Sequence, residues 1–237
     1  NVHAPDGRHT LVDYNRACTP LMEIVSEPDL RSPEEAKIFL QELRLIMRCL
    51  RISDADMEKG HLRCDANVNL WAVDARGEQL AATPIVEIKN MNSFKALERA
   101  LAYEIERQTQ DYRDTGHTLH DRPKTTRGWN DAAGVTEEQR TKEESHDYRY
   151  FPEPDLPPLD FSPGAPGGFD LAALQADIPE LPIQRRKRYT KEYALSAADA
   201  RQLTEDPRLA DYFERVMSEL GSWIDALPEH TDQQETR

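Results

Sequence analysis

The sequence has few cysteines and no long hydrophobic run, and each absence removes a class of protein. Its three cysteines, Cys18, Cys49 and Cys64, include no Cys-x-x-Cys spacing, which argues against a secreted disulfide framework and a self-contained zinc knuckle. No apolar stretch approaches the roughly 18 residues of a membrane span, and no charged-then-apolar segment opens the chain. We therefore expect a cytoplasmic protein with reduced thiols and no membrane partner.

Several familiar site motifs are also missing. The sequence contains no P-loop, no glycine-rich dinucleotide fingerprint and no Gly-x-Ser-x-Gly turn. No cysteine has an activating histidine close to it in the sequence, so nucleophilic catalysis by this chain is poorly supported. Any nucleotide would therefore have to bind in a cleft made by a sheet and its carboxylates.

Basic residues are scarce, since 30 lysines and arginines face 44 acidic residues among 237, and the formal net charge is −14. This charge disfavours non-specific nucleic-acid binding, which depends on counterion release by a basic surface. The densest positive run contains Arg185, Arg186, Lys187 and Arg188. Such a run is usually a solvated helix face, but its charge also makes it the best candidate for a contact with a nucleic-acid backbone.

Two helices are predicted from local signals. One runs from Ser32 to about Leu50, because Ser32 and Glu35 form a capping box ahead of apolar residues at helical spacing. The other begins at Asn92 or Ser93 and ends before Gly116. Its buried stripe is expected to consist of Phe94, Leu97, Leu101 and Ile105.

Between these helices the pattern changes to the period of two that is typical of strands. Apolar residues alternate with polar ones from Leu62 to Leu70, and a second short strand spans Ile85 to Asn90 after a turn near Asp74 to Gly77. Leu21 to Val25 also looks extended. We expect the strands at Leu62 and Ile85 to pair antiparallel, and the irregular mixture of strands and helices indicates an α+β fold.

The proposed pairing gathers polar residues on one face of the sheet, namely Arg63, Asp65, Asn67, Glu87 and Lys89. A solvated face explains this pattern, because antiparallel sheets commonly leave one side wet. A cation and phosphate site explains it equally, because carboxylates such as Glu23 and Glu87 suit Mg²⁺ while Arg63 and Lys89 neutralise phosphates.

The last third of the sequence contains a further candidate segment and a helical tail. Residues His146 to Asp155 mix aromatic and acidic residues with Arg149, which could clamp a phosphate or stack on a base, or belong to an anchored loop. Prolines and glycines then cluster from Phe151 to Pro182, and helices capped by Ser196 and Asp206 follow.

Several stretches, taken in order, resemble one protein family. They are Leu11–Arg16, Pro20–Asp29, Asp56–Glu58 with Leu62–Val68, Glu87–Asn90 with Asn92–Phe94, and Asp147–Pro152. Together they closely resemble the B-subunit family of the aspartyl/glutamyl-tRNA(Asn/Gln) amidotransferases, and the resemblance runs from Leu11 into the helical tail.

The resemblance implies a fold and a reaction. Residues 1–175 would be part of a catalytic cradle domain similar to glutamine synthetase, with an antiparallel sheet, and residues 176–237 would begin an all-α helical domain. The implied enzyme is an ATP-dependent carbon–nitrogen ligase with glutamine as amido donor, acting on Glu-tRNA(Gln), Asp-tRNA(Asn) or both. Its partners would be misacylated tRNA, a small C subunit, and the glutaminase, or A, subunit.

Site residues are carried over by motif. Glu23 and Glu87 would hold Mg²⁺, Arg63, Lys89 and Arg149 would contact the phosphates of ATP, and the run from Arg185 to Arg188 would contact tRNA. The family's N-terminal metal-binding motif and C-terminal tail domain are missing, so we expect the isolated chain to bind Mg²⁺–ATP weakly and to be inactive. The rival hypothesis is a non-catalytic module that docks tRNA or a protein partner.

Overall fold

The computed structural model describes residues 2–3, 9–15, 19–141, 157–162, 164–165 and 168–227. The chain divides into two compact units, Asn1–Arg31 and Ser32–Arg237, and each is described by itself. Among the described residues, no helix is both long enough and apolar enough to cross a bilayer.

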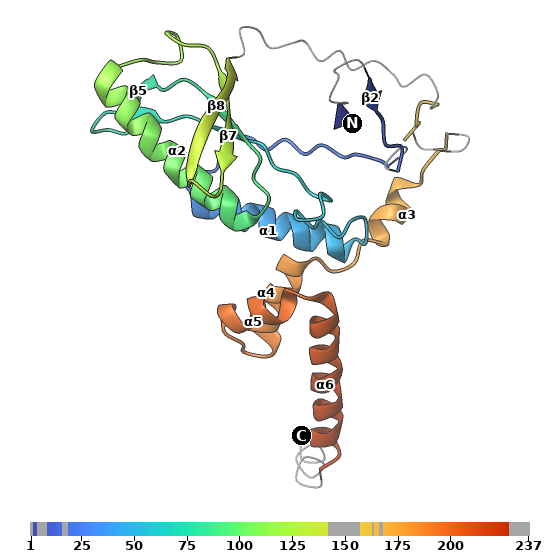
Figure 1. Ribbon diagram of the computed structural model, residues 1–237. Coiled ribbons are helices and arrows are strands. Elements are labelled where there is room, and N and C mark those ends of the chain that lie inside the picture. The colour runs from blue at the N-terminus through green and yellow to red at the C-terminus, as the bar shows by residue number, and fades with distance from the viewer. Residues whose placement is uncertain are drawn as a thin grey trace. The chain divides into compact units, whose positions relative to one another are not determined.

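The first unit contains one small antiparallel pair of strands, β1 (Val2–His3) and β2 (Thr10–Leu11) (Figure 1). Leu21 to Val25, which the pattern predicted to be extended, belongs to no strand. All five of its side chains are exposed, and Leu21 and Val25 are exposed by 95% and 82%. The alternation of that segment therefore does not reflect a buried face.

The first helix of the second unit confirms the predicted capping signals. Helix α1 spans Pro33–Cys49, and the Ser32 hydroxyl accepts a hydrogen bond from the Glu35 backbone N–H at 3.1 Å. This bond satisfies one of the N–H groups that the first turn of a helix leaves without a partner. Leu40, Leu45 and Met47 are the buried residues of α1.

Helix α2 spans Phe94–Thr115, with Ser93 as its N-cap and Gly116 as its C-cap. Gly116 has a φ of 67°, a left-handed conformation that favours glycine. Leu97 and Leu101 are buried as predicted, but Ile105 is only half-buried. Two polar residues, Glu104 and Gln108, complete the buried side of α2, which the hydrophobic pattern does not predict.

A four-stranded sheet packs against α2. Its strands are β3 (Ala66–Val68), β6 (Val86–Lys89), β7 (Thr125–Asn130) and β8 (Val135–Thr141), in the order β3-β6-β7-β8. The pairs β3–β6 and β7–β8 are antiparallel, and β6–β7 is parallel. The predicted antiparallel pairing of the first two strands is thus confirmed, within a sheet of mixed direction.

A hairpin that the sequence did not predict lies between β3 and β6. Strand β4 (Trp71–Val73) pairs with β5 (Gln79–Ala82), and the turn expected near Asp74 to Gly77 joins these two strands. An Asp74 carboxylate oxygen accepts hydrogen bonds from the backbone N–H groups of Arg76 and Glu78. The predicted turn is therefore present, but it joins a different pair of strands.

The main hydrophobic core lies between the sheet and the helices α1 and α2. Its buried members are Leu40, Val86, Ile88, Met91, Ala96, Leu97, Ala100, Leu101 and Trp129. Val86 and Ile88 point into this core from β6, so the alternate residues Glu87 and Lys89 lie on the opposite face of the sheet. The core therefore determines which face carries the predicted polar residues.

The tail contains α3 (Leu171–Ala176), α4 (Pro182–Glu192), α5 (Ala197–Thr204) and α6 (Pro207–Asp225). The predicted caps are confirmed, because the side chains of Ser196 and Asp206 accept hydrogen bonds from the first turns of α5 and α6. Tyr189, Ala200 and Ala210 form a second buried cluster. The predicted domain boundary between residues 175 and 176 falls at the end of α3, inside the second compact unit, and stays a prediction.

Candidate active site on the polar face of the sheet

The strand register brings together four of the five polar residues expected on this face. Asn67 of β3 lies directly opposite Glu87 of β6. The ammonium nitrogen of Lys89 donates a hydrogen bond to Asp65 Oδ2 at 2.5 Å and lies 3.4 Å from Glu87 Oε1. Burial alternates from Leu62 to Val68 as the pattern predicted, although only Ala66–Val68 belongs to the ladder.

Glu87 is the most enclosed of these groups, with an exposed fraction of 9%. Its Oε2 atom accepts a hydrogen bond of 2.9 Å from the hydroxyl of Thr126, which is itself buried. Thr126 is in register with Glu87 on the parallel neighbour β7. The hydroxyl therefore holds one carboxylate oxygen in place, while Lys89 lies near the other.

Thr126 is a site residue that the sequence pattern does not indicate, because it lies on β7, a strand outside the predicted elements. A strand signal was present, since the β-branched pair Thr125 and Thr126 precedes Trp129 and follows Pro123. The signal would have identified a strand, but it could not have shown that this strand runs parallel to β6. Only that direction and register place the Thr126 hydroxyl beside Glu87.

Lys89 is the positive centre of the face. Burial lowers the pKa of Lys89, but the hydrogen bond to Asp65, the charge of Asp65 and the neighbouring Glu87 raise it more, so the pKa lies above its ordinary value. The side chain is therefore cationic at neutral pH. A fixed ammonium beside a buried carboxylate can neutralise a phosphate group that approaches this face.

The described contacts do not link the other three predicted site residues to this cluster. Arg63 precedes β3 and is exposed, as Asp65 two residues later is. Glu23 is exposed and belongs to the first unit, so the expected meeting of Glu23 with Glu87 stays a prediction. Arg149 falls in the range 142–156, outside the described residues, and its role also stays a prediction.

The donor set suits a hard cation that shares its ligands with a phosphate. Within the described ranges, no group of three or more His, Cys, Asp or Glu side chains could hold a metal ion. Mg²⁺ is commonly bound through only one or two carboxylates, with waters and substrate phosphates completing the octahedron. Thr126 determines the orientation of the Glu87 carboxylate, and its binding of Mg²⁺ stays a prediction.

The basic run of helix α4 is engaged in ion pairs within the chain. Arg188 contacts Glu180 at 2.7 Å and Glu214 at 2.5 Å, and Arg186 contacts Glu42 at 2.6 Å. Arg185 pairs with Asp211 at 2.9 Å, whereas Lys187 is exposed. The ion pairs assign the three arginines a structural role, joining α4 to α1 and α6, and their contact with tRNA stays a prediction.

We expect the change Arg188→Gln to destabilise the tail. It removes the donor that bridges Glu180 and Glu214, and it leaves two half-buried carboxylates without this partner. A charge-assisted hydrogen bond contributes about 1.5–3 kcal/mol, and partial exposure places the expected loss near the lower value. Urea unfolding of the full-length protein measures it. Lys187→Gln is the matched control, and equal stability of the two variants would argue against the structural role.

Cys64 is a structural thiol, as the alternation predicted. It is half-buried, precedes β3 and packs against the main core, whereas its neighbour Asp65 is exposed. Burial, followed by the negative charge of Asp65, raises the pKa of Cys64 to about 11. The thiol is therefore protonated throughout the neutral range, which argues against a nucleophilic role.

Alkylation tests this assignment of Cys64. Because the thiolate is the reacting species, we expect iodoacetamide to leave Cys64 unmodified at pH 8 in the folded protein and to modify it in urea. The native rate should rise only as the pH approaches about 11. Peptide mass spectrometry locates the modified cysteine, and rapid alkylation of native Cys64 at pH 7 would contradict the prediction.

Comparison with known proteins shows which protein family this chain is similar to. The model of the GatB/GatE catalytic domain matches residues 1–165. The aspartyl/glutamyl-tRNA(Asn/Gln) amidotransferase B subunit of Herpetosiphon aurantiacus is 48% identical over 217 residues, which cover 92% of this chain and 42% of that protein. The same B subunit of Moorella thermoacetica is 48% identical over 230 residues, 94% of this chain and 46% of that protein.

These matches confirm the resemblance found in the sequence motifs. The chain spans a little under half the length of the relatives to which it was compared. The matched region includes both the polar sheet face with Glu87 and the strand that supplies Thr126. The chain belongs to the family of aspartyl/glutamyl-tRNA(Asn/Gln) amidotransferase B subunits.

Proposed function

We propose that this chain forms part of the catalytic domain of a ligase that amidates misacylated tRNA at the expense of ATP. The observation that carries the proposal is the buried carboxylate of Glu87, which Thr126 orients and which lies beside the cationic Lys89. Membership of the family supports the same reaction class. A merely solvated sheet face does not require a carboxylate with so little exposure.

The proposed reaction has two steps. The side-chain carboxylate of a glutamate or aspartate esterified to tRNA attacks the γ-phosphorus of ATP, the bridging P–O bond breaks, and ADP leaves. Ammonia then attacks the carbonyl carbon of the acyl phosphate, the C–O bond to phosphate breaks, and the amide nitrogen loses a proton. Phosphorylation is needed because a free carboxylate oxygen is a poor leaving group. Both steps depend on positioning and charge neutralisation, and neither needs a nucleophile from the enzyme.

The residues of the polar face have complementary roles in this proposal. Glu87 and, by the family motif, Glu23 would hold Mg²⁺, which when bound would neutralise charge on the phosphates of ATP. Lys89 and Arg63 contact phosphate oxygens, with Arg149 as a further contact. Thr126 keeps the Glu87 carboxylate in one orientation, so that the ligand geometry is preorganised before substrates arrive.

The proposal includes the wider assembly. The acceptor is Glu-tRNA(Gln), Asp-tRNA(Asn) or both, and the ammonia comes from the glutaminase, or A, subunit of a heterotrimer that is completed by a small C subunit. Residues 1–175 belong to a cradle similar to the catalytic fold of glutamine synthetase, and residues 176–237 begin a helical domain that contacts tRNA.

Amidation without glutamine tests the proposed function directly. The full-length protein, assembled with its partners, is given radiolabelled Glu-tRNA or Asp-tRNA, ATP, Mg²⁺ and ammonium chloride in place of glutamine. We expect amidated aminoacyl-tRNA and ADP in equal amounts, and neither product without the misacylated tRNA. The proposal would be overturned if amidation proceeded without ATP, or if the amount of ADP released did not match the amount of amide formed.

A further inference from the structure

A small cavity lies on the side of the sheet opposite the candidate active site. Its volume is about 60 Å³, and it is lined by residues of α2, of the loop after α2 and of β7. Val86 is one of the lining residues, and it points away from Glu87 because the two are neighbours on strand β6. The cavity is therefore separate from the face that carries Glu87 and Lys89.

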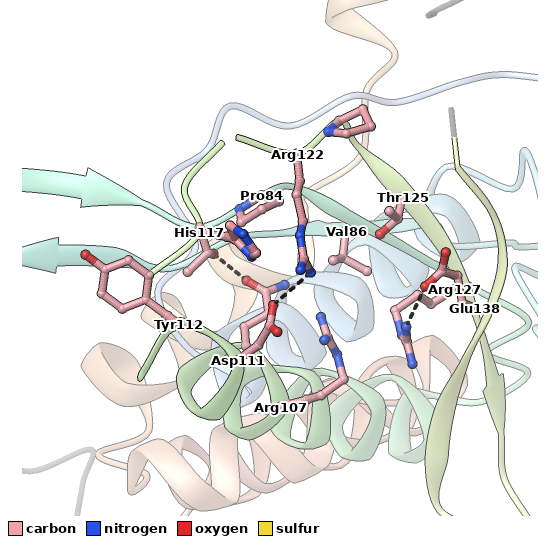
Figure 2. Close-up of a pocket in the computed structure, with 13 residues that line it drawn as sticks. Pro84, Val86, Arg107, Asp111, Tyr112, His117, Arg122, Thr125, Arg127 and Glu138 are labelled. Carbon is pink, nitrogen blue, oxygen red and sulfur yellow. Dashed lines mark hydrogen bonds and ion pairs between the residues drawn. The ribbon is translucent and has the colours of Figure 1, made fainter. Parts of the chain in front are cut away.

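Three arginines from different elements reach this cavity. Figure 2 shows the side chains of Arg107 from α2, Arg122 from the loop and Arg127 from β7 extending into the same space. Arg107 uses Nε and Nη2 to bind the buried Glu104, and Arg127 uses Nε and Nη2 to bind Thr136. A guanidinium carries five N–H donors, so each of these side chains has donors beyond the bonds just given.

Two acidic side chains beside the cavity lie too far from the Nη1 atoms of Arg122 and Arg127 for a typical hydrogen bond. Arg122 Nη1 lies 3.7 Å from Asp111 Oδ2, and Arg127 Nη1 lies 3.6 Å from Glu138 Oε2. Both distances exceed the 2.7–3.2 Å range typical of hydrogen bonds between nitrogen and oxygen. The Glu138 side chain is 54% exposed and the Asp111 side chain 32% exposed, so both can turn to solvent and leave the guanidinium groups to another anion.

A buried imidazole atom also points to a missing partner. Nδ1 of His117, which lines the cavity, is buried and has no hydrogen-bond partner among the residues that the structure describes. Most buried polar atoms in proteins are hydrogen-bonded, and those that are not call for an explanation such as an absent ion or water. His117 thus adds a polar atom to a cavity already lined by guanidinium groups.

We propose that this cavity binds an oxyanion of the phosphate class. The planar fork of arginine matches phosphate oxygens, and three forks converge here from separate elements. The volume is several times the roughly 10–15 Å³ that one water molecule needs, so the cavity has room for a group larger than a single water. The group is either free inorganic phosphate or one phosphate of an RNA backbone.

Phosphate binding by an arginine variant tests this inference independently of the proposed amidation. Inorganic phosphate is titrated into the full-length protein at constant ionic strength, with chloride replacing it in the reference, and binding is followed by ³¹P NMR. We expect Arg122→Gln to weaken binding by about tenfold or more, because one charge-assisted contact is lost. Arg122 is half exposed, so this variant is expected to fold.

The matched control is Arg76→Gln, which changes the charge equally at an exposed turn between β4 and β5. It should bind phosphate as the unaltered protein does. A competing RNA oligonucleotide identifies the source of the phosphate: displacement indicates a backbone phosphate, and no displacement indicates the free ion. Binding that is absent up to roughly tens of millimolar phosphate, or that is equal in the Arg122→Gln and unaltered proteins, would overturn the inference.

Discussion

Replacing Glu87 by Gln is expected to reduce tRNA-dependent ATP cleavage and amidation by at least about a hundredfold, while the glutaminase activity of the assembled complex is spared. The change removes the negative charge that the proposed Mg²⁺ site requires, and effects of this size are typical when one preorganised electrostatic group is lost from an active site. The amide keeps the shape of the side chain, and its oxygen can still accept the hydrogen bond from Thr126.

The effect of Glu87→Gln is measured as kcat for ADP release and for amide formation in the full-length protein with its partners. Glu78→Gln is the matched control, because Glu78 is an exposed acidic residue in the turn of the β4–β5 hairpin. It should leave both rates unchanged. Normal amidation by Glu87→Gln would mean that the polar face is a docking or solvated surface, as in the rival hypothesis.

Replacing Glu104 by Ala is expected to destabilise the second unit by about 3–5 kcal/mol. Glu104 is fully buried on α2, where its carboxylate accepts bonds from Arg107 at 2.6 Å and from the Thr136 hydroxyl at 2.7 Å. Gln108 donates to it at 3.2 Å, and Arg127 lies 3.6 Å away. Its removal leaves two partly buried guanidinium groups without their shared partner. Removing one member of a buried ion pair lowers stability strongly, because the remaining charge stays buried without compensation.

Urea unfolding of the full-length protein measures this loss, with Glu106→Ala as the control on the exposed side of the same helix. Domains are commonly stable by only about 5–15 kcal/mol, so Glu104→Ala can prevent folding altogether. Glu104→Gln is therefore the second variant, and it should fall between the alanine variant and the unaltered protein because it keeps an acceptor for Thr136. Stability of Glu104→Ala equal to that of Glu106→Ala would contradict the prediction.

Local interactions account for the parts of the fold that the sequence predicted well. Ser32, Ser93 and Ser196 each cap the helix that begins after them, because a cap involves atoms only a few residues apart. The period of two also placed Asp65, Asn67 and Glu87 on one face correctly, since successive residues of a strand must point to opposite sides. The motifs in the same stretches of sequence identified the family.

Contacts between distant segments account for what was missed. Which elements pack together decides that β4 pairs with β5, that Ile105 is only half-buried and that Glu104 is buried. The spacing of apolar residues along the sequence does not predict the burial of a polar residue such as Glu104. The role of the basic run also depends on contacts between distant segments. Its residue types favour a solvated face or a nucleic-acid contact, but the acids that pair with Arg185 and Arg188 come partly from α6.

The sequence by itself determined the family, the starts of helices α1, α2, α5 and α6, and the facing of the polar strand residues, because each depends on neighbours along the chain. Only the tertiary structure decided that Thr126 orients Glu87, that the basic run is paired internally, and that three arginines converge on one cavity. The physical reason is that strand direction and register, and the packing of helices, depend on long-range contacts whose partners have no fixed separation in the sequence.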